Sequence, residues 1–197
     1  MAAPLTDIAR DQLFREARTN QYFDGRPVSP EQIHALWDLM KMAPTSMNQL
    51  PARIVWCHTQ AAKDRLAAHV MPGNVDKVQN APVCAILAMD LNFHDHLPML
   101  FPSGNAKPMF DANAEMRQTN AFRNSSLQGG YLIMAARALG LDCGPMSGFN
   151  NSAVDADFFA DEPGWKSNFI CSIGYGDPAR LHPRGPRPDF DLFNRIV

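Results

Sequence analysis

The sequence predicts one globular domain whose core is built from both helices and strands. Its 197 residues suffice for one substantial domain and are too few for two ordinary ones. Hydrophobic residues make up 46% of the chain and charged residues 19%, which is typical of a globular protein. Helical and strand-like apolar patterns both occur along the chain, so we expect both kinds of element to contribute to the core.

The clearest helix signal is SPEQIHALWDLMKMA, residues 29 to 43. Ser29 is the expected N-cap, Pro30 suits the first turn, and Gln32 completes a capping box. Apolar residues then recur at helical spacing, which predicts that one face of this helix packs on a core. A strand is expected at residues 53 to 58.

A second helix is expected at residues 60 to 70, after Thr59. The stretch PVCAILAM, residues 82 to 89, is apolar at consecutive positions. It therefore predicts a central strand that is covered on both faces. Residues 90 to 110 show no clean period, and a connection of that length is usually a functional lid or binding segment.

A long helix is predicted from about 112 to 139, closed by Gly140. Its Gly129-Gly130 pair would be costly on an exposed face, so we expect another helix to approach closely there, and that helix could belong to a second subunit. CGPMSGF, residues 143 to 149, predicts a turn.

A short helix capped by Asn151 or Ser152 should follow, then a last core strand within 168 to 176. The proline-rich tail after Asp177 is expected to run extended over a surface.

Composition argues against several function classes. The net charge of −2 indicates no nucleic-acid partner, and the longest apolar run, residues 81 to 89, is too short to span a membrane. The N-terminal residues lack the pattern of a secretory signal, so we expect a soluble cytoplasmic protein. The four cysteines are widely spaced and are expected to be buried free thiols. His94 and His96 are assigned to a solvated loop rather than to a metal site.

Four segments combine small hydroxyl or amide groups with isolated basic residues, namely 17 to 23, 44 to 48, 74 to 77 and 183 to 187. Separate basic residues suit a phosphate group, and amides in tight turns suit the edge of a planar heterocycle. The chain has neither G-x-G-x-x-G nor G-x-x-x-x-G-K-[ST]. From the residues alone, a binder of a phosphorylated planar ligand and a set of ordinary turns, caps and solvated lysines both remain open.

The order of these motifs resembles the FMN-dependent nitroreductase family. The motifs are ART-x-x-x-F, APTS-x-N, N-x-x-K before an apolar strand, AFRNSSLQ, GLDCGPMSGF and SIGYGDP. Within that family they are most similar to the branch that contains the malonic semialdehyde reductase of pyrimidine degradation. The resemblance implies an α+β fold with a mixed, mainly antiparallel sheet flanked by helices. It also implies a single domain, 1–197, with an extended arm at about 178–197, in a homodimer that exchanges tails.

The same resemblance implies FMN at each subunit interface and NADH or NADPH as co-substrate. Hydride would pass through flavin N5 to a small electrophilic acceptor, with malonic semialdehyde reduced to 3-hydroxypropionate as one candidate reaction. A general nitroaromatic or quinone reductase and a non-catalytic flavin-binding protein are the alternatives. No protein acid, base or nucleophile is required for this chemistry.

The resemblance also implies a set of cofactor-binding residues. The first segment would begin a helix and bind the FMN phosphate together with the tail, a lysine would favour negative charge on the flavin, and the turn near residue 145 would line the ring near N5. The chain departs from the family at Ala17 and Gln21, where basic residues are common, and Gln49-Leu50 interrupts the frequent N-x-Q-P-W pattern. Arg123 would either pair with an acidic side chain in the core or face the substrate. The implied binding residues are Arg18, Thr19, Gln21, Pro44, Thr45, Ser46, Asn48, Asn74, Lys77, Pro145, Met146, Ser147, Gly148, Arg184 and Arg187.

Overall fold

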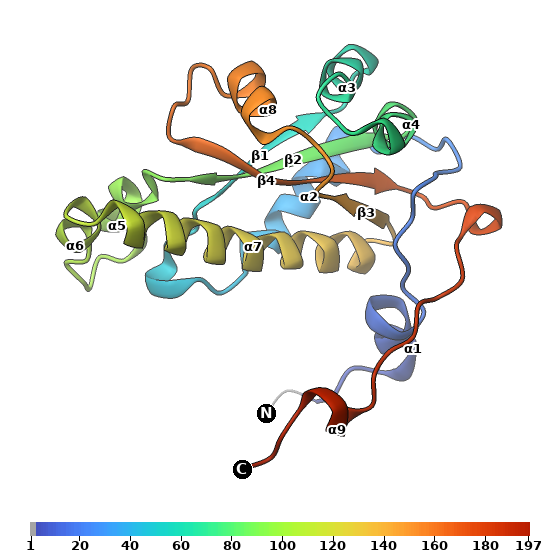
Figure 1. Ribbon diagram of the computed structural model, residues 1–197. Helices are drawn as coiled ribbons and strands as arrows, with labels where there is room; N and C mark the ends of the chain where they lie inside the picture. The colour runs from blue at the N-terminus through green and yellow to red at the C-terminus, as the bar shows by residue number, and fades with distance from the viewer. Residues whose placement is uncertain (1–2) are drawn as a thin grey trace.

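A four-stranded sheet lies between two layers of helices in the computed structural model, which describes residues 3–197 (Figure 1). Neighbouring strands pair antiparallel, and Thr19 adds one parallel bridge to Cys143 at the edge of the sheet. The expected α+β class with a mixed, mainly antiparallel sheet is confirmed. The strands, in the spatial order β1-β2-β4-β3, are β1 (Ala52–Cys57), β2 (Val83–Asp90), β3 (Asp142–Met146) and β4 (Trp165–Gly174).

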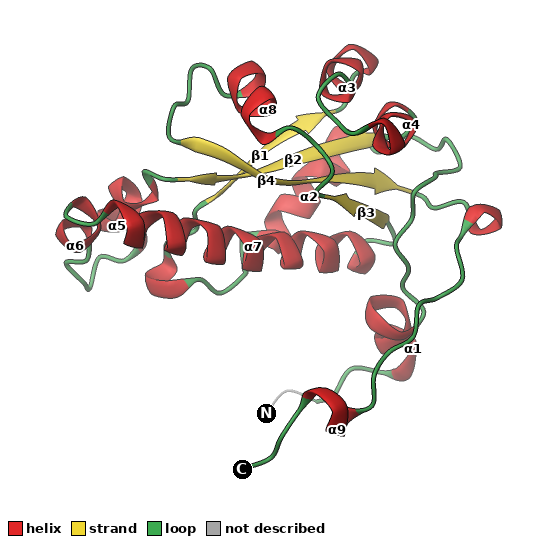
Figure 2. Ribbon diagram, viewed as in Figure 1, coloured by secondary structure: helices red, strands yellow, loops and turns green. Residues whose placement is uncertain are grey.

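The helices cover both faces of the sheet because strand β2 is apolar on both of its faces. Ala85 and Leu87 belong to one core, and Cys84 and Ile86 belong to a second core on the opposite face. The central strand expected at 82 to 89 is therefore confirmed. Figure 2 shows the two helical layers. They are formed by α2 (Pro30–Met40) and α7 (Ala114–Ala138) on one face, and by α3 (Gln60–Ala67), α4 (Val75–Gln79) and α8 (Asn151–Phe158) on the other.

The predicted helix boundaries are largely confirmed by the capping hydrogen bonds. Ser29 and Gln32 form the expected capping box on α2, and Thr59 caps α3. Gly140 follows α7 with φ of +74°, a conformation that glycine adopts without strain. The cap of α8 is Asn150, one residue before the predicted position, because Asn150 has the extended backbone and its side chain accepts the N–H of Ala153.

The two glycines of α7 have different surroundings. A Cβ on Gly129 would lie 2.5 Å from the Phe169 ring and 2.7 Å from Leu87 Cδ2, so the element that approaches Gly129 is the sheet. The expectation of another helix at this position is wrong. Gly130 is exposed, and a Cβ on it would have no atom within 4 Å, so this position is open on the outer face of α7.

The segment CGPMSGF begins as a strand rather than a turn, which corrects the sequence prediction. β3 includes Gly144 and Pro145; β4 is its one neighbour in the four-stranded sheet, and its outer edge makes a single bridge, from Cys143 to Thr19. An edge strand tolerates proline since one side of its backbone makes no ladder hydrogen bonds.

Residues 90 to 110 are folded rather than irregular, contrary to the sequence prediction. Their helical turns are η4 (Phe93–His96), α5 (Leu97–Leu100) and α6 (Lys107–Asp111). Phe93, Leu97 and Phe110 form a small core with Ala121 of α7. Phe93, Leu97 and Phe110 are unevenly spaced along the chain and produce no helical or strand period. The apolar pattern of the sequence therefore did not reveal these turns.

The first described residues and the C-terminal tail lie below the layered body in Figure 1. Helical turns at the N-terminal end are α1 (Asp7–Arg10) and a π-helical turn, Asp11–Arg15. Arg18 to Gln21 follow these turns as an extended segment, so the expectation that they begin a helix is wrong. The tail is exposed and mostly extended, as expected, with short turns at Pro178–Arg180 and at α9 (Phe190–Phe193).

Among residues 3–197, the helices are too short or too polar for any of them to cross a bilayer. A cytoplasmic location stays a prediction. All four cysteines are buried free thiols, as expected.

Candidate functional site

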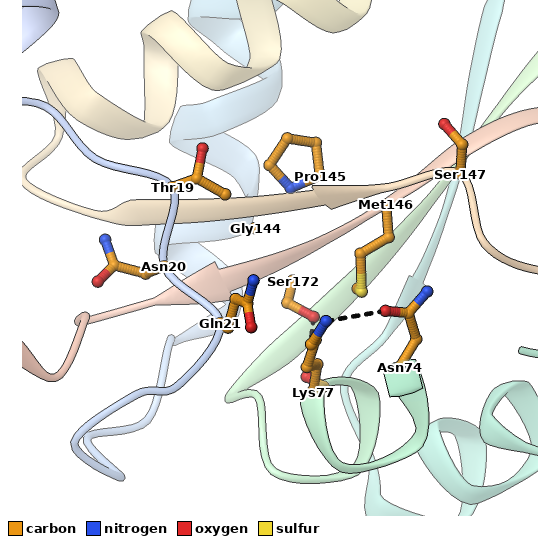
Figure 3. Close-up of a pocket in the computed structure, with 10 residues that line it drawn as sticks. All are labelled: Thr19, Asn20, Gln21, Asn74, Lys77, Gly144, Pro145, Met146, Ser147 and Ser172. Atoms are coloured by element: carbon orange, nitrogen blue, oxygen red, sulfur yellow. Dashed lines mark hydrogen bonds between the residues drawn. The ribbon is translucent and has the colours of Figure 1, made fainter. Parts of the chain in front are cut away.

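A cavity of about 230 Å³ lies where the extended N-terminal segment runs beside strand β3 (Figure 3). Thr19 bridges to Cys143, and the Asn20 N–H donates to the Cys143 carbonyl at 2.9 Å. A Cβ on Gly144 would lie 2.2 Å from the Asn20 carbonyl oxygen, so only glycine permits this close approach. The lining residues are Thr19, Asn20, Gln21, Asn74, Lys77, Gly144, Pro145, Met146, Ser147 and Ser172.

The opposite wall of this cavity is formed by the start of α4. The Asn74 amide donates to the Gly148 carbonyl at 3.0 Å, and its Oδ1 accepts from Lys77 Nζ at 3.1 Å. Ser172 Oγ donates to the Lys77 carbonyl at 3.0 Å and ties α4 to β4. Lys77 makes no ion pair with the carboxylates of residues 3–197, so its remaining donors are available to a ligand in the cavity.

A second cavity of about 230 Å³ adjoins the first, and Thr19 and Gln21 line both. Four arginines surround it, contributed by the N-terminal segment, α7 and the tail. Each donates to backbone carbonyls, and none lies within ion-pair distance of a carboxylate in the described part of the chain. Such a group of uncompensated cations suits a phosphate. They are Arg18, Arg137, Arg184 and Arg187.

The carbonyl contacts position these arginines. Arg184 donates to the carbonyls of Arg15 at 2.8 Å and Ala17 at 3.2 Å, and Arg18 donates to the His182 carbonyl. Arg137 donates to the Leu13 carbonyl at 2.8 Å. The tail and the N-terminal segment are thereby held together around the cavity.

Residues 44 to 48 lie elsewhere, beside the first half of α7. Met47 and Asn48 have φ of 51° and 50°, and Leu50 has φ of 41°, a backbone region that costs side-chain-bearing residues about 1 kcal/mol or more each. Three neighbouring residues in this region indicate a functional constraint. Asn124 supports the segment by accepting the Ser46 N–H at 2.9 Å, and Asn48 donates to the Leu100 carbonyl at 2.8 Å.

A cluster in η4 and α6 corrects the assignment of His94 to a solvated loop. His94 is buried, and its Nε2 lies 3.1 Å from Asp111 Oδ1. Lys107 lies between Asp95 at 3.0 Å and Asp111 at 2.8 Å, and its hydrogen bonds lower the pKa of both carboxyls. His94, Asp95 and Asp111 are close enough to share an ion, but the Lys107 ammonium already compensates the two acids.

Comparison with known proteins identifies the family. The pattern of the Nitroreductase family matches residues 14–175, which is most of the chain. The chain belongs to the nitroreductase family. It is therefore an oxidoreductase. Among its relatives, proteins from Rhodopseudomonas palustris and Polynucleobacter asymbioticus are each 53% identical over 197 residues and match over 100% of both chains. Both carry the provisional name NADH dehydrogenase/NAD(P)H nitroreductase.

Solved structures of other nitroreductases show the same fold. A provisionally assigned nitroreductase from Bacillus subtilis superposes with a TM-score of 0.85 at 21% identity, covering 98% of this chain and 100% of the other. A provisionally assigned nitroreductase from Exiguobacterium sibiricum, solved in complex with FMN, superposes with a TM-score of 0.83 at 19% identity and covers 100% of both chains.

Most of the site residues expected from this family lie around the two cavities. Gly148 contacts Asn74 at the rim, while the four predicted residues within segment 44 to 48 line neither cavity. Arg123 is exposed on α7 and makes no ion pair among the described residues, so pairing with an acidic side chain in the core is wrong. The predicted residues that line the cavities are Arg18, Thr19, Gln21, Asn74, Lys77, Pro145, Met146, Ser147, Arg184 and Arg187.

Sequence reasoning missed several lining residues, chiefly Asn20, Arg137, Gly144, Ser172 and His182. Asn20 and Gly144 lie inside motifs that were recognised, so their positions between predicted contacts were a usable signal. Arg137 gave a weaker signal, because a basic residue in the last turn of a helix is common for electrostatic reasons alone.

Proposed function

We propose that this nitroreductase binds FMN across the two adjoining cavities and transfers hydride from NADH or NADPH to a small electrophilic acceptor. The observation that carries the proposal is the pair of donor sets joined at Thr19 and Gln21. One set is cationic and suits a phosphate, and the other offers amides and a lysine and suits the edge of a planar heterocycle. FMN carries both groups on one molecule.

The arginines would hold the phosphate end of the cofactor. Arg18, Arg184 and Arg187 come from both ends of the chain and can therefore donate from different directions. Arg137 adds a fourth cation, which compensates for Gln21 at a position where the family commonly has a basic residue. The phosphate would also shield these guanidinium groups from one another.

Lys77 and Asn74 would hold the pyrimidine edge of the ring, with Pro145 to Ser147 beside the reacting face. When FMN is bound, its N5 supplies the hydride-transfer chemistry. The ammonium of Lys77 would stabilise negative charge that develops on the ring, and Asn74 would keep that ammonium in place through the 3.1 Å hydrogen bond. The protein therefore needs mainly to orient the reactants and stabilise charge, and the proton that completes the reduction of the acceptor would come from water.

A second copy of the chain would complete the site. Segment 44 to 48 lies on the first half of α7, whereas the first cavity is lined by residues of β3, which lies beside the second half of α7 in Figure 1. Two chains related by a twofold axis can bring this segment of one copy to the cavity of the other. The exposed apolar residues Leu127 and Tyr131 on the outer face of α7, and those of the tail, support a homodimer with exchanged tails.

Two acceptor classes follow from the relatives and the motifs. The names of the R. palustris and P. asymbioticus relatives favour nitro compounds as acceptors that can be assayed. The motif resemblance favours malonic semialdehyde, reduced to 3-hydroxypropionate, as the physiological acceptor. Quinones are a third class that the same hydride chemistry would reduce.

The test is the visible spectrum of the purified protein, followed by titration of cofactor-free protein with FMN. We expect flavin absorbance, reduction by NADH or NADPH without oxygen, and reoxidation on addition of a nitroaromatic compound. A protein with no flavin absorbance, which regains none when FMN is added, would overturn the proposal. A bound flavin that stays reduced after acceptors are added would instead identify a non-catalytic flavin-binding protein.

A further inference from the structure

Arg123 is an exposed arginine on α7 that makes no hydrogen bond or ion pair with the described residues. It lines a surface cavity of about 630 Å³ along the outer face of this helix. Arginines elsewhere in the body of the protein have partners: Arg53 pairs with Asp90, and Arg117 donates to the Phe110 carbonyl. An arginine that carries its full set of donors into a cavity is available to an anion.

The neighbouring residue Asn124 shows where Arg123 lies relative to segment 44 to 48. Asn124 is 2% exposed, accepts the Ser46 N–H at 2.9 Å and donates to Gln49 Oε1 at 3.1 Å. These bonds fix segment 44 to 48 to the same turn of α7 that carries Arg123. If that segment forms one wall of the flavin site, Arg123 lies at the rim of the same site.

The other residues of this cavity suit a small conjugated acceptor. Phe122 is 55% exposed and offers an aromatic surface, and Thr119 offers a hydroxyl group. Glu115 is the one acidic residue that lines the cavity, and it lies two helical turns from Arg123. The charge near Arg123 is therefore positive.

The geometry points to Arg123 as the residue that selects acceptors carrying a carboxylate, by donating two parallel hydrogen bonds to that group while the electrophilic end faces the flavin. This inference rests on the proposed function and deepens it, because it assigns a chemical class to the acceptor. The guanidinium group matches the planar geometry of a carboxylate, and lysine at this position would supply charge without that match. Arg123 would be a specificity residue with no part in the reduction of the flavin.

The experiment compares two acceptors that share a nitro group and a ring, 4-nitrobenzoate and 4-nitrobenzamide. We expect Arg123→Gln to raise the KM for 4-nitrobenzoate about tenfold or more, from the loss of charge-assisted hydrogen bonds, while the KM for 4-nitrobenzamide changes less than about twofold. The KM of Arg123→Lys for 4-nitrobenzoate should lie between that of the unmodified protein and that of Arg123→Gln. The matched control is Arg65→Gln, which removes the same charge from α3, a helix on the opposite face of the sheet, and should alter neither KM.

A binding measurement without turnover complements these kinetics. Benzoate and benzamide are titrated into the oxidised FMN-loaded protein, and the visible flavin spectrum reports occupancy. Arg123→Gln should weaken benzoate binding about tenfold and leave benzamide binding unchanged.

Several outcomes would overturn the inference. An equal change in KM for both acceptors, or no change for either, would show that Arg123 does not recognise the carboxylate. Slower flavin reduction by NADH or NADPH in Arg123→Gln would assign Arg123 to the nucleotide instead, and a fall to the monomer mass would place it in the subunit interface. Failure of the unmodified protein to reduce either acceptor would contradict the proposed function, which is a different result.

Discussion

Asn124 and Ser46 are joined by a hydrogen bond of 2.9 Å that fixes a strained loop to the longest helix of the protein. We expect Asn124→Ala to lower the free energy of unfolding on the order of 2 kcal/mol or more, because it leaves the Ser46 N–H without an acceptor and Gln49 Oε1 without a donor. Urea denaturation measures this loss, and FMN affinity should fall with it. Asn80→Ala is the control, since exposed Asn80 donates only to the Asp76 carbonyl, and an equal loss there would contradict the assignment.

Adjacent glycines of α7 should respond in opposite directions to the same substitution. Gly129→Ala forces a methyl group against Phe169 and Leu87 and should cost about 1–3 kcal/mol. Gly130→Ala meets no atom within 4 Å and should stabilise the protein by up to about 1 kcal/mol through helix propensity. Thermal and urea unfolding of the two variants provide the comparison. Destabilisation by Gly130→Ala together with a smaller mass on sizing would show that a second subunit covers Gly130.

Lys77→Ala should slow the reduction of flavin by NADH or NADPH more than it weakens FMN binding. The reason is that the Lys77 ammonium would stabilise negative charge that develops on the ring, whereas the arginine-lined cavity would supply most of the free energy of FMN binding. Stopped-flow absorbance gives the reduction rate, and fluorescence titration gives the dissociation constant. Lys166→Ala, which removes an exposed ammonium on β4, serves as the control. Equal losses in rate and affinity would argue against the proposed role of Lys77.

Truncation after Asp177 should abolish both the dimer and flavin binding. It removes Arg184 and Arg187 from the arginine-lined cavity, and it removes the exposed apolar residues of the tail. Truncation after Pro188 retains both arginines and should weaken the dimer alone, which separates the two contributions. Sizing and visible absorbance follow both properties. A stable yellow monomer from the shorter chain would contradict tail exchange.

Stability should fall in alkaline solution because two buried thiols resist ionisation. Burial raises the pKa of Cys57 to about 11 and that of Cys84 to about 12, from an ordinary value of 9.0. As the pH rises above 9.0, the unfolded chain releases these protons first, so the stabilisation is lost progressively until the folded pKa values are reached. Urea denaturation between pH 8 and pH 11 tests this, and Cys84→Ala should show a shallower decline. An unchanged decline would assign the effect to other groups.

The sequence was sufficient to predict features that depend on residues close together in the chain. The capping box at Ser29 and Gln32, the cap at Thr59 and the glycine stop at Gly140 each depend on residues within one turn. The strand near 82 to 89 was also predictable, because burial on both faces requires consecutive apolar residues. The motifs that resemble the family were found by their order along the chain, and most of the predicted binding residues line the two cavities.

The features that could not be predicted are those decided by distant neighbours. Gly144 and Pro145 disfavour a strand and predict a turn, and the edge position of β3 in the sheet overrides that preference. Arg137 reaches the arginine-lined cavity only because the end of α7 meets the N-terminal segment.

The sequence by itself determined the fold class, the family and most of the candidate contact residues, since these follow from short-range patterns and ordered motifs. Only the tertiary structure decided that the predicted cofactor-binding residues divide between two adjoining cavities and a separate strained loop at residues 44 to 48. Chain distance does not encode spatial distance, so Asn124 meets Ser46, and Arg184 meets Ala17, only once the sheet and α7 have brought them together.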